Sequence, residues 1–133
     1  MSRVFLDTVG LLAIWDKNDA WHAPASQAYQ LLTSQRSHLF TTHFVLLECG
    51  NAAARRPYRN EPDNLRATLA LINGLITPTE EDWETAWANY RKGGPGSAGI
   101  VDQVSFVVMR RMKFSSVFTH DQHFRTAGFT PLF

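Results

Sequence analysis

The stretch Arg3-Val4-Phe5-Leu6-Asp7-Thr8 is a short apolar run that ends in an acid and a hydroxyl. Such a run predicts a buried strand, with Asp7 at its carboxyl end. The segment Ser115–Thr119 repeats this pattern, since Asp121 follows it by two residues. The two stretches therefore predict neighbouring strands that each carry an acid just beyond their carboxyl end.

The rest of the chain alternates between short strands and helical spacing. The other expected strands are His38–Thr41, a strand or turn at Ile76–Pro78, and Phe129–Phe133. Helices are expected at Thr8–Trp15, Trp21–Gln35, Thr42–Arg56 (which Pro57 ends), Ile100–Met112 and Asp121–Thr126 (which Gly128 caps). Another is expected from the helical face that Leu65, Leu69, Ile72 and Leu75 share. A last one carries Trp83, Trp87 and Tyr90 and follows the expected capping box Thr77–Glu80. Residues Lys92–Gly99, with four glycines and a proline, predict a loop.

This alternation indicates an α/β domain with a parallel sheet and helices on both faces. At 133 residues, with no repeat or linker, the chain is expected to form one domain over 1–133. In such sheets, ligands bind beyond the carboxyl ends of the strands. Asp7 and Asp121 are expected to lie at that edge.

The composition excludes several classes of protein. The 13 basic and 12 acidic residues give a net charge of +1, which excludes a globally basic nucleic-acid coat. Cys49 is the single cysteine, so a disulfide framework and a cysteine-based zinc cluster are excluded and a reducing, cytoplasmic setting is expected. No apolar run approaches the roughly 20 residues of a membrane span, and the early acid at position 7 does not fit a signal peptide.

The 12 acids fall into two groups by sequence context. Eight have polar neighbours and are expected on solvated faces or at helix starts: Asp16, Asp19, Glu61, Asp63, Glu80, Glu81, Asp82 and Glu84. The other four, Asp7, Glu48, Asp102 and Asp121, interrupt or follow apolar runs. Burying an unpaired carboxylate costs several kcal/mol or forces protonation. Four that converge would repel unless a cation held them, and hard divalent cations such as Mg²⁺ and Mn²⁺ prefer oxygen ligands.

Each of these acids also has a purely structural interpretation. Asp7 and Asp121 could be N-caps of the helices that follow, and Asp102 could serve the first turn of its helix. Glu48 lies well inside its expected helix, so it cannot cap, but it could pair with an arginine. Caps alone do not require acids in all three places, because Ser, Thr or Asn would serve as well.

The residues around these acids resemble the PIN domain family. The resemblance rests on four runs taken together, in this order and spacing: Phe5-Leu6-Asp7-Thr8, Leu46-Leu47-Glu48, Ile100–Phe106 and Phe118–Phe124, with the ending Asp121-x-His123-Phe124-x-x-x-Gly128-Phe129. They are most similar to the VapC-type toxin ribonucleases of bacterial toxin–antitoxin pairs. One departure is that many PIN domains carry Asn shortly after the first acid, where this chain has Thr8-Val9-Gly10.

The resemblance implies a three-layer α/β/α fold and a metal-dependent endoribonuclease using one or two Mg²⁺ or Mn²⁺ ions. It implies Asp7, Glu48, Asp102 and Asp121 as the acidic site, with Thr119 as a polar neighbour. Thr8 can supply a hydroxyl in place of the absent Asn. It also implies a cytoplasmic protein, often a homodimer, that is inhibited by a cognate antitoxin.

Basic and aromatic residues offer further candidates. Arg55, Arg56 and Arg59 follow the Glu48 helix and are expected to contact RNA phosphates. Arg110, Arg111 and Lys113 are attributed to the negative end of a helix dipole. Trp83 and Trp87 are expected to pack in the core or an interface. Trp15 and Trp21 flank a polar loop and could stack on bases, but no role is assigned to them.

Two other functions stay open at this point. Another Mg²⁺-dependent phosphoryl hydrolase could use acids at strand ends, although the haloacid-dehalogenase type needs a second Asp where this chain has Val9. A degenerate PIN-like domain could bind RNA or protein without cleaving. Loss of one or more acids would indicate it, and all four are present.

Overall fold

A computed structural model describes residues 2–93 and 96–133. Its centre is a parallel five-stranded sheet in the order β3-β2-β1-β4-β5. The strands are β1 (Arg3–Leu6), β2 (His38–Thr42), β3 (Leu75–Ile76), β4 (Ser116–Phe118) and β5 (Thr130–Pro131). The α/β class expected from the sequence is confirmed.

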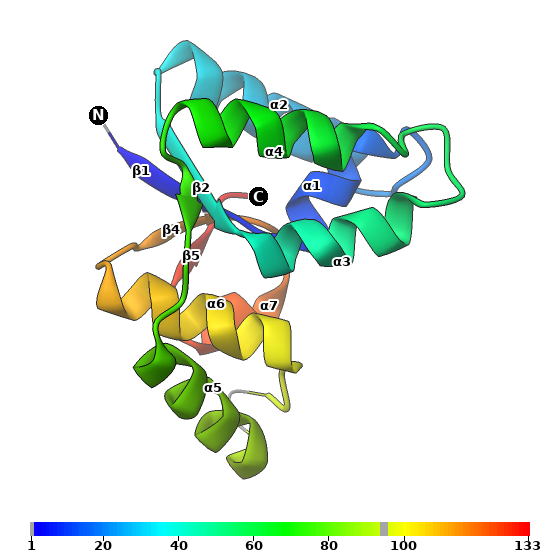
Figure 1. Ribbon diagram of the computed structural model, residues 1–133. Coiled ribbons are helices and arrows are strands. Elements are labelled where there is room, and N and C mark those ends of the chain that lie inside the picture. Colours follow the sequence, from blue (N-terminus) through cyan, green and yellow to red (C-terminus); the bar gives the residue numbers. More distant parts are fainter. Residues whose placement is uncertain (1, 94–95) are drawn as a thin grey trace.

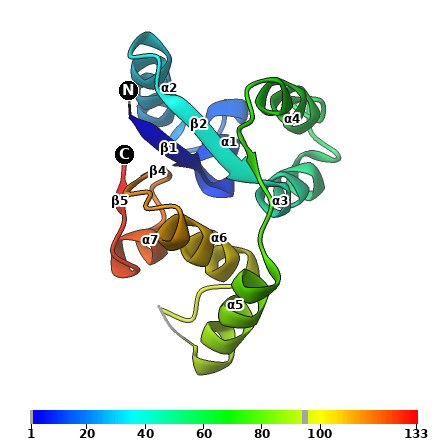
Figure 2. The same ribbon diagram turned by 60° about the vertical axis from the view of Figure 1, so that its left-hand side comes forward.

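Helices cover both faces of this sheet (Figures 1 and 2). They are α1 (Thr8–Trp15), α2 (His22–Ser34), α3 (His43–Ala53), α4 (Glu61–Leu71), α5 (Glu80–Lys92), α6 (Ile100–Arg111) and α7 (Gln122–Thr126). The helices α1, α2 and α4 lie on one side, and α5, α6 and α7 lie on the other. This is the three-layer arrangement that the resemblance implied.

The central strand β1 sets the position of the first acid. β1 pairs with β2 and with β4, where Leu6 lies opposite Phe118, so the carboxyl ends of β1 and β4 are level. Phe5, Leu6 and Phe118 are fully buried. Gly10 of α1 packs so closely on β4 that an added Cβ would lie 2.1 Å from the carbonyl oxygen of Phe118. Glycine at this position therefore allows α1 to begin directly beside β4.

The predicted helical face of Leu65, Leu69, Ile72 and Leu75 was wrong at its end. Ile72 and Leu75 do not continue the face of α4: the helix ends at Leu71, Ile72 is exposed and Leu75 belongs to β3. The backbone leaves the helix there because Asn73 has a φ of 57° and Gly74 lies against the carbonyl oxygen of Leu39, too close for a side chain.

The capping box of α5 lies two residues later than expected. The Thr79 hydroxyl accepts from the backbone N–H of Asp82, and the Asp82 carboxylate accepts from that of Thr79. Asp82 was expected on a solvated face or at a helix start: it does lie in the first turn of α5, but it is buried. Thr79 is the N-cap and has the extended backbone of that position, with φ −83° and ψ 167°.

The remaining boundaries differ little from the expected ones. α3 ends at Ala53, so Arg55 and Arg56 lie beyond it rather than on it. Residues 94 and 95 of the expected glycine-rich loop lie outside the described residues. Within residues 2–93 and 96–133, no helix is both long and apolar enough to span a membrane.

Candidate active site

The first acid of the site, Asp7, lies between β1 and α1. It is the N-cap of α1, and its Oδ2 accepts a hydrogen bond from the backbone N–H of Val9 at 3.3 Å. The same oxygen accepts one from the hydroxyl of Thr119 at 2.9 Å. Asp7 is 1% exposed. Burial, followed by the charges of Asp102 and Asp121, raises the pKa of Asp7 to about 8 despite these hydrogen bonds.

Thr119 connects the acids that follow the two central strands. It comes directly after β4, and its side chain is fully buried. Its hydroxyl donates to Asp7 and accepts from the backbone N–H of Asp121 at 3.1 Å. One hydroxyl therefore fixes the separation of the β1 and β4 ends at the site.

Asp102 and Asp121 form the more open part of the site. Carboxylate oxygens of both and a ring nitrogen of His123 lie within 4.8 Å of one another. Burial, followed by the charges of Asp121 and Glu48, raises the pKa of Asp102 to about 6. The charge of Asp121 thus opposes ionisation of Asp102.

Glu48 reaches the site from α3. Its Oε1 accepts a hydrogen bond of 2.6 Å from the hydroxyl of Thr8, and its charge acts on Asp102. A rim glutamate paired with an arginine was the structural alternative for this residue. Within the described part of the chain, Glu48 makes no such pair, and Thr8 is its hydrogen-bond partner.

His123 is the residue that sequence reasoning did not count in the site. Its Nδ1 lies 2.7 Å from Oδ1 of Asp121, and its Nε2 lies 3.1 Å from the carbonyl oxygen of Gly96. Both partners are acceptors, so only the doubly protonated ring donates to both. The hydrogen bond to Asp121 is the largest cause of its raised pKa. The spacing Asp121-x-His123 was the sequence signal that placed it beside an acid.

Capping and convergence turn out to be compatible. Asp7 and Asp121 both accept hydrogen bonds from the starts of their helices, as the structural interpretation required. Asp102 lies in the first turn of α6, as expected, but it makes no cap, because Gly99 is the N-cap and no side-chain capping hydrogen bond is present. The two caps nevertheless interact electrostatically with Asp102, so capping does not account for the cluster.

The donor set fits a hard divalent cation. The ligand atoms that lie together belong to Asp102, Asp121 and His123, and Asp7 and Glu48 are linked to Asp102 through their charges rather than placed in that group. Mg²⁺ and Mn²⁺ prefer oxygen ligands of this kind. A bound dication would also remove the repulsion that raises the pKa values of Asp7 and Asp102.

Comparison with known proteins now places the chain. The family model for the PIN domain matches residues 4–130, nearly the whole sequence. The chain belongs to the PIN domain family. Among curated proteins, no sequence matches it significantly.

One solved PIN-like relative covers the full fold. It is VapC20 of Mycobacterium tuberculosis, described as a toxin that cleaves the sarcin–ricin loop. The two chains are 25% identical, the similarity covers 96% of each, and the TM-score is 0.76. The PIN family match gives no support to the alternative of an unrelated phosphoryl hydrolase.

The arginines that are candidates for RNA contact differ in whether other parts of the protein already bind their side chains. A side-chain nitrogen of Arg59 donates to the carbonyl oxygen of Ala54, so Arg59 closes the end of α3. Arg55 and Arg56 are exposed, and no hydrogen bond or ion pair engages their side chains within residues 2–93 and 96–133. Their contact with RNA stays a prediction. Arg110 and Arg111 bond to Ala127 and Asp82, which accounts for both without RNA.

Proposed function

We propose that this PIN domain is a metal-dependent endoribonuclease that hydrolyses RNA phosphodiester bonds, and that it is the toxin of a type II toxin–antitoxin pair. The observation that carries the proposal is Asp7, a buried carboxylate that the charges of two other acids act on, with no cation paired to it within residues 2–93 and 96–133. Such a group is costly unless an ion occupies the site. The similarity to VapC20 along the whole chain supports RNA as the substrate class.

We assign Asp7, Asp102 and Asp121 to metal coordination and Glu48 to coordination or to orienting the attacking water. One or two Mg²⁺ or Mn²⁺ ions would lower the pKa of that water and stabilise charge on the phosphate. Thr8 and Thr119 act on this set through hydrogen bonds, holding Glu48 and Asp7 in place. His123 holds Asp121 from the side of the loop at Gly96. Thr8 therefore fills part of the role expected of the missing Asn.

The test compares RNA cleavage by the purified protein with cleavage by Asp102→Asn, each with Mn²⁺ or with EDTA. The substrates are a sarcin–ricin stem–loop, chosen because VapC20 cleaves that loop, and total RNA. We expect cleavage only by the wild type with metal. Equal cleavage by the variant would remove the proposed site, and cleavage in EDTA would remove the metal requirement.

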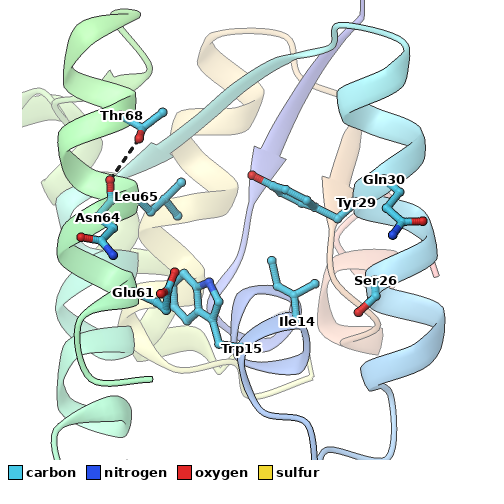
Figure 3. A pocket seen from close by; sticks show the side chains of 9 residues that line it. All are labelled: Ile14, Trp15, Ser26, Tyr29, Gln30, Glu61, Asn64, Leu65 and Thr68. Carbon is cyan, nitrogen blue, oxygen red and sulfur yellow. Dashed lines mark hydrogen bonds between the residues drawn. The ribbon is translucent and has the colours of Figure 1, made fainter. Parts of the chain in front are cut away.

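We also infer a protein antitoxin as partner, and a groove on the far side of the sheet from α6 supports it. The groove, about 440 Å³, lies between α2 and α4 at the end of α1 (Figure 3). Ile14, Trp15, Tyr29 and Leu65 give it an apolar floor and walls. None of its nine lining residues is cationic and Glu61 is acidic, so it suits an apolar peptide face better than an RNA backbone.

The toxin role has its own test, separate from that of catalysis. Expression of the active protein should arrest growth, and co-expression of a small neighbouring gene product should relieve the arrest. Harmless expression of a protein that cleaves RNA in vitro would contradict the toxin role and leave the nuclease intact. We further propose a cytoplasmic homodimer, which light scattering of the purified protein would check.

A further inference from the structure

Trp21 occupies an unusual position at the edge of the site. It immediately precedes α2, and its indole stacks on the ring of His120, with centroids 4.2 Å apart and planes at 11°. His120 is the residue before Asp121. Trp21 is still 43% exposed although His120 covers one face of its ring. Part of the residue therefore stays exposed to solution beside its stack on His120.

The platform formed by Trp21 and His120 is held rigidly. Phe133 packs against both rings, and on its other side it contacts Phe118, which is fully buried. The backbone N–H of Trp21 donates to the carboxylate of Asp19 at 2.8 Å, and its carbonyl accepts from Ala25 at 2.9 Å. The pair is thus anchored to the core and to the loop, so little freedom remains to be lost when a ligand binds.

The platform is continuous with the acidic site. His120 lines an open hollow of about 490 Å³ together with Asp121, His123 and Gly96. Trp21 does not itself line this hollow, and it meets the hollow's edge through its stack on His120, the residue before Asp121. An RNA strand whose phosphate lies at the carboxylates and that leaves the hollow past His120 would meet the stacked indole there.

We propose that Trp21, supported by His120, is a base-stacking subsite for a nucleotide next to the scissile phosphate. This rests on the proposed ribonuclease function and deepens it. Stacking on an aromatic ring accepts any base, because every base has a π-face. The subsite would add affinity and register along the strand, while base identity would be read elsewhere.

Trp87 provides a matched control within the same chain. It is 45% exposed and makes one edge-to-face contact with Tyr90, so it resembles Trp21 in exposure and in having an aromatic neighbour. It lies on α5, and its aromatic partner Tyr90 does not line the hollow beside Asp121, whereas His120, the partner of Trp21, does. The loss of an exposed indole as such is therefore the same in Trp21→Ala and Trp87→Ala.

The binding experiment uses Asp102→Asn protein, to prevent cleavage, and RNA oligonucleotides that each carry one 2-aminopurine, at successive positions. We expect quenching of the probe at one position near the cleavage point. Trp21→Ala should abolish this quenching and raise the Kd about 5- to 150-fold, the value of one stacked base. Trp21→Phe should restore most of both, and Trp87→Ala should change neither.

The kinetic experiment uses wild-type protein and the same variants with Mn²⁺. For Trp21→Ala we expect the loss to fall on KM more than on kcat.

A loss confined to kcat would mean that Trp21 only positions Asp121 through His120, and would overturn the subsite. Unchanged KM and Kd in a folded Trp21→Ala protein would overturn it while the nuclease stands. A change in oligomeric state on Trp21→Ala, with unchanged quenching, would assign the ring to a protein interface instead. Absence of cleavage by the wild type would instead reject the proposed function.

Discussion

Asp7 and Asp82 are both buried, at 1% and 3% exposure, and both accept hydrogen bonds at the start of a helix. Their electrostatic surroundings are opposite. Arg111 donates from Nε to both oxygens of Asp82 at 3.0 Å and contacts it through a second nitrogen at 2.8 Å. Asp7 has two hydrogen bonds from neutral groups and faces Asp102 and Asp121.

The pKa values follow these surroundings. Burial raises the pKa of Asp82, but the hydrogen bonds from Arg111 and Thr79 outweigh it and leave that pKa below its usual value. Burial and two like charges raise the pKa of Asp7 to about 8. A buried acid therefore indicates a functional site only where the chain supplies no cation for it, and the sequence does not reveal which case applies.

The largest effect is expected on cleavage. Asp7→Asn keeps the shape and the capping acceptor but removes a proposed metal ligand. Even partners outside the ligand shell are worth about 10–100-fold in metal affinity or activity, so we expect a loss of more than about 100-fold. Asp82→Asn should cleave like the wild type at a temperature where both are folded. Equal losses of initial cleavage rate in Asp7→Asn and Asp82→Asn would mean that Asp7 matters only as a buried acid and not as a metal ligand.

For stability we expect the opposite order: losing the cation of Asp82 should cost more than losing the charge of Asp7. Arg111→Ala leaves Asp82 buried without its cation, and we expect a loss of about 2–4 kcal/mol in the free energy of unfolding, toward the lower end because Arg111 is partly exposed. Asp7→Asn should leave the metal-free protein as stable as the wild type or more so, because it removes a repelled charge. Urea unfolding in EDTA measures both values, and greater destabilisation by Asp7→Asn would contradict the assignment.

The two acids also predict opposite dependences on pH. The pKa of Asp7 in the folded protein is raised. The stability that its protonated form adds is therefore fully present below the ordinary pKa of 3.8 and is lost as pH rises toward 8. Asp102 adds the same trend up to about pH 6. Asp82, with a lowered pKa, contributes at neutral pH and loses its contribution only in acid.

Thermal melting in EDTA should therefore show falling stability from pH 5 to pH 8, by up to about 1.4 kcal/mol per pH unit for one proton. Mg²⁺ or Mn²⁺ should stabilise the protein more at pH 8 than at pH 5, and Asp7→Asn should flatten the trend. A metal-free protein that is more stable at pH 8 than at pH 5 would contradict the raised pKa of Asp7.

The fold and the four acids were within reach of sequence reasoning for a definite reason. Asp7, Glu48, Asp102 and Asp121 each break an apolar context, and short strands between helices leave one edge where strand ends can meet. Asp82 was misplaced because its neighbours in sequence are polar. Its partner Arg111 lies 29 positions away, and only the packing of α5 on α6 brings the two together.

His123 and the stack of Trp21 on His120 show the same limit. The hydrogen bond of His123 to Asp121 is local in sequence, but its second hydrogen bond, to Gly96, depends on where the α5–α6 loop lies. Trp21 and His120 come from opposite ends of the sequence and meet only through the order of the strands. Pairings of this kind are set by tertiary structure and leave no periodic signal.

A smaller effect is expected from the hydroxyl that holds Asp7. Thr119→Val removes the bond to Asp7 and the acceptor for the N–H of Asp121, and we expect about a tenfold loss of cleavage. Thr41→Val is the matched control, because Thr41 is equally buried and its hydroxyl donates to the carbonyl of Leu6 at 2.7 Å. Both should lose stability, and only Thr119→Val should raise the Mn²⁺ concentration needed for half-maximal cleavage. A similar metal requirement in both would mean that Thr119 is structural.

The smallest effect concerns the cations that are not engaged by the protein. Arg111 and Arg59 are bound to Asp82 and Ala54, whereas no ion pair or hydrogen bond from any described residue engages the side chains of Arg55 and Arg56. Replacing Arg55 or Arg56 with Ala should weaken RNA binding a few-fold, evenly across sequences, and lower the slope of log K against log salt by about one unit. Arg66→Ala is the control, because that residue pairs with Asp63 on α4. An unchanged salt slope in both arginine variants would show that neither Arg55 nor Arg56 contacts an RNA phosphate.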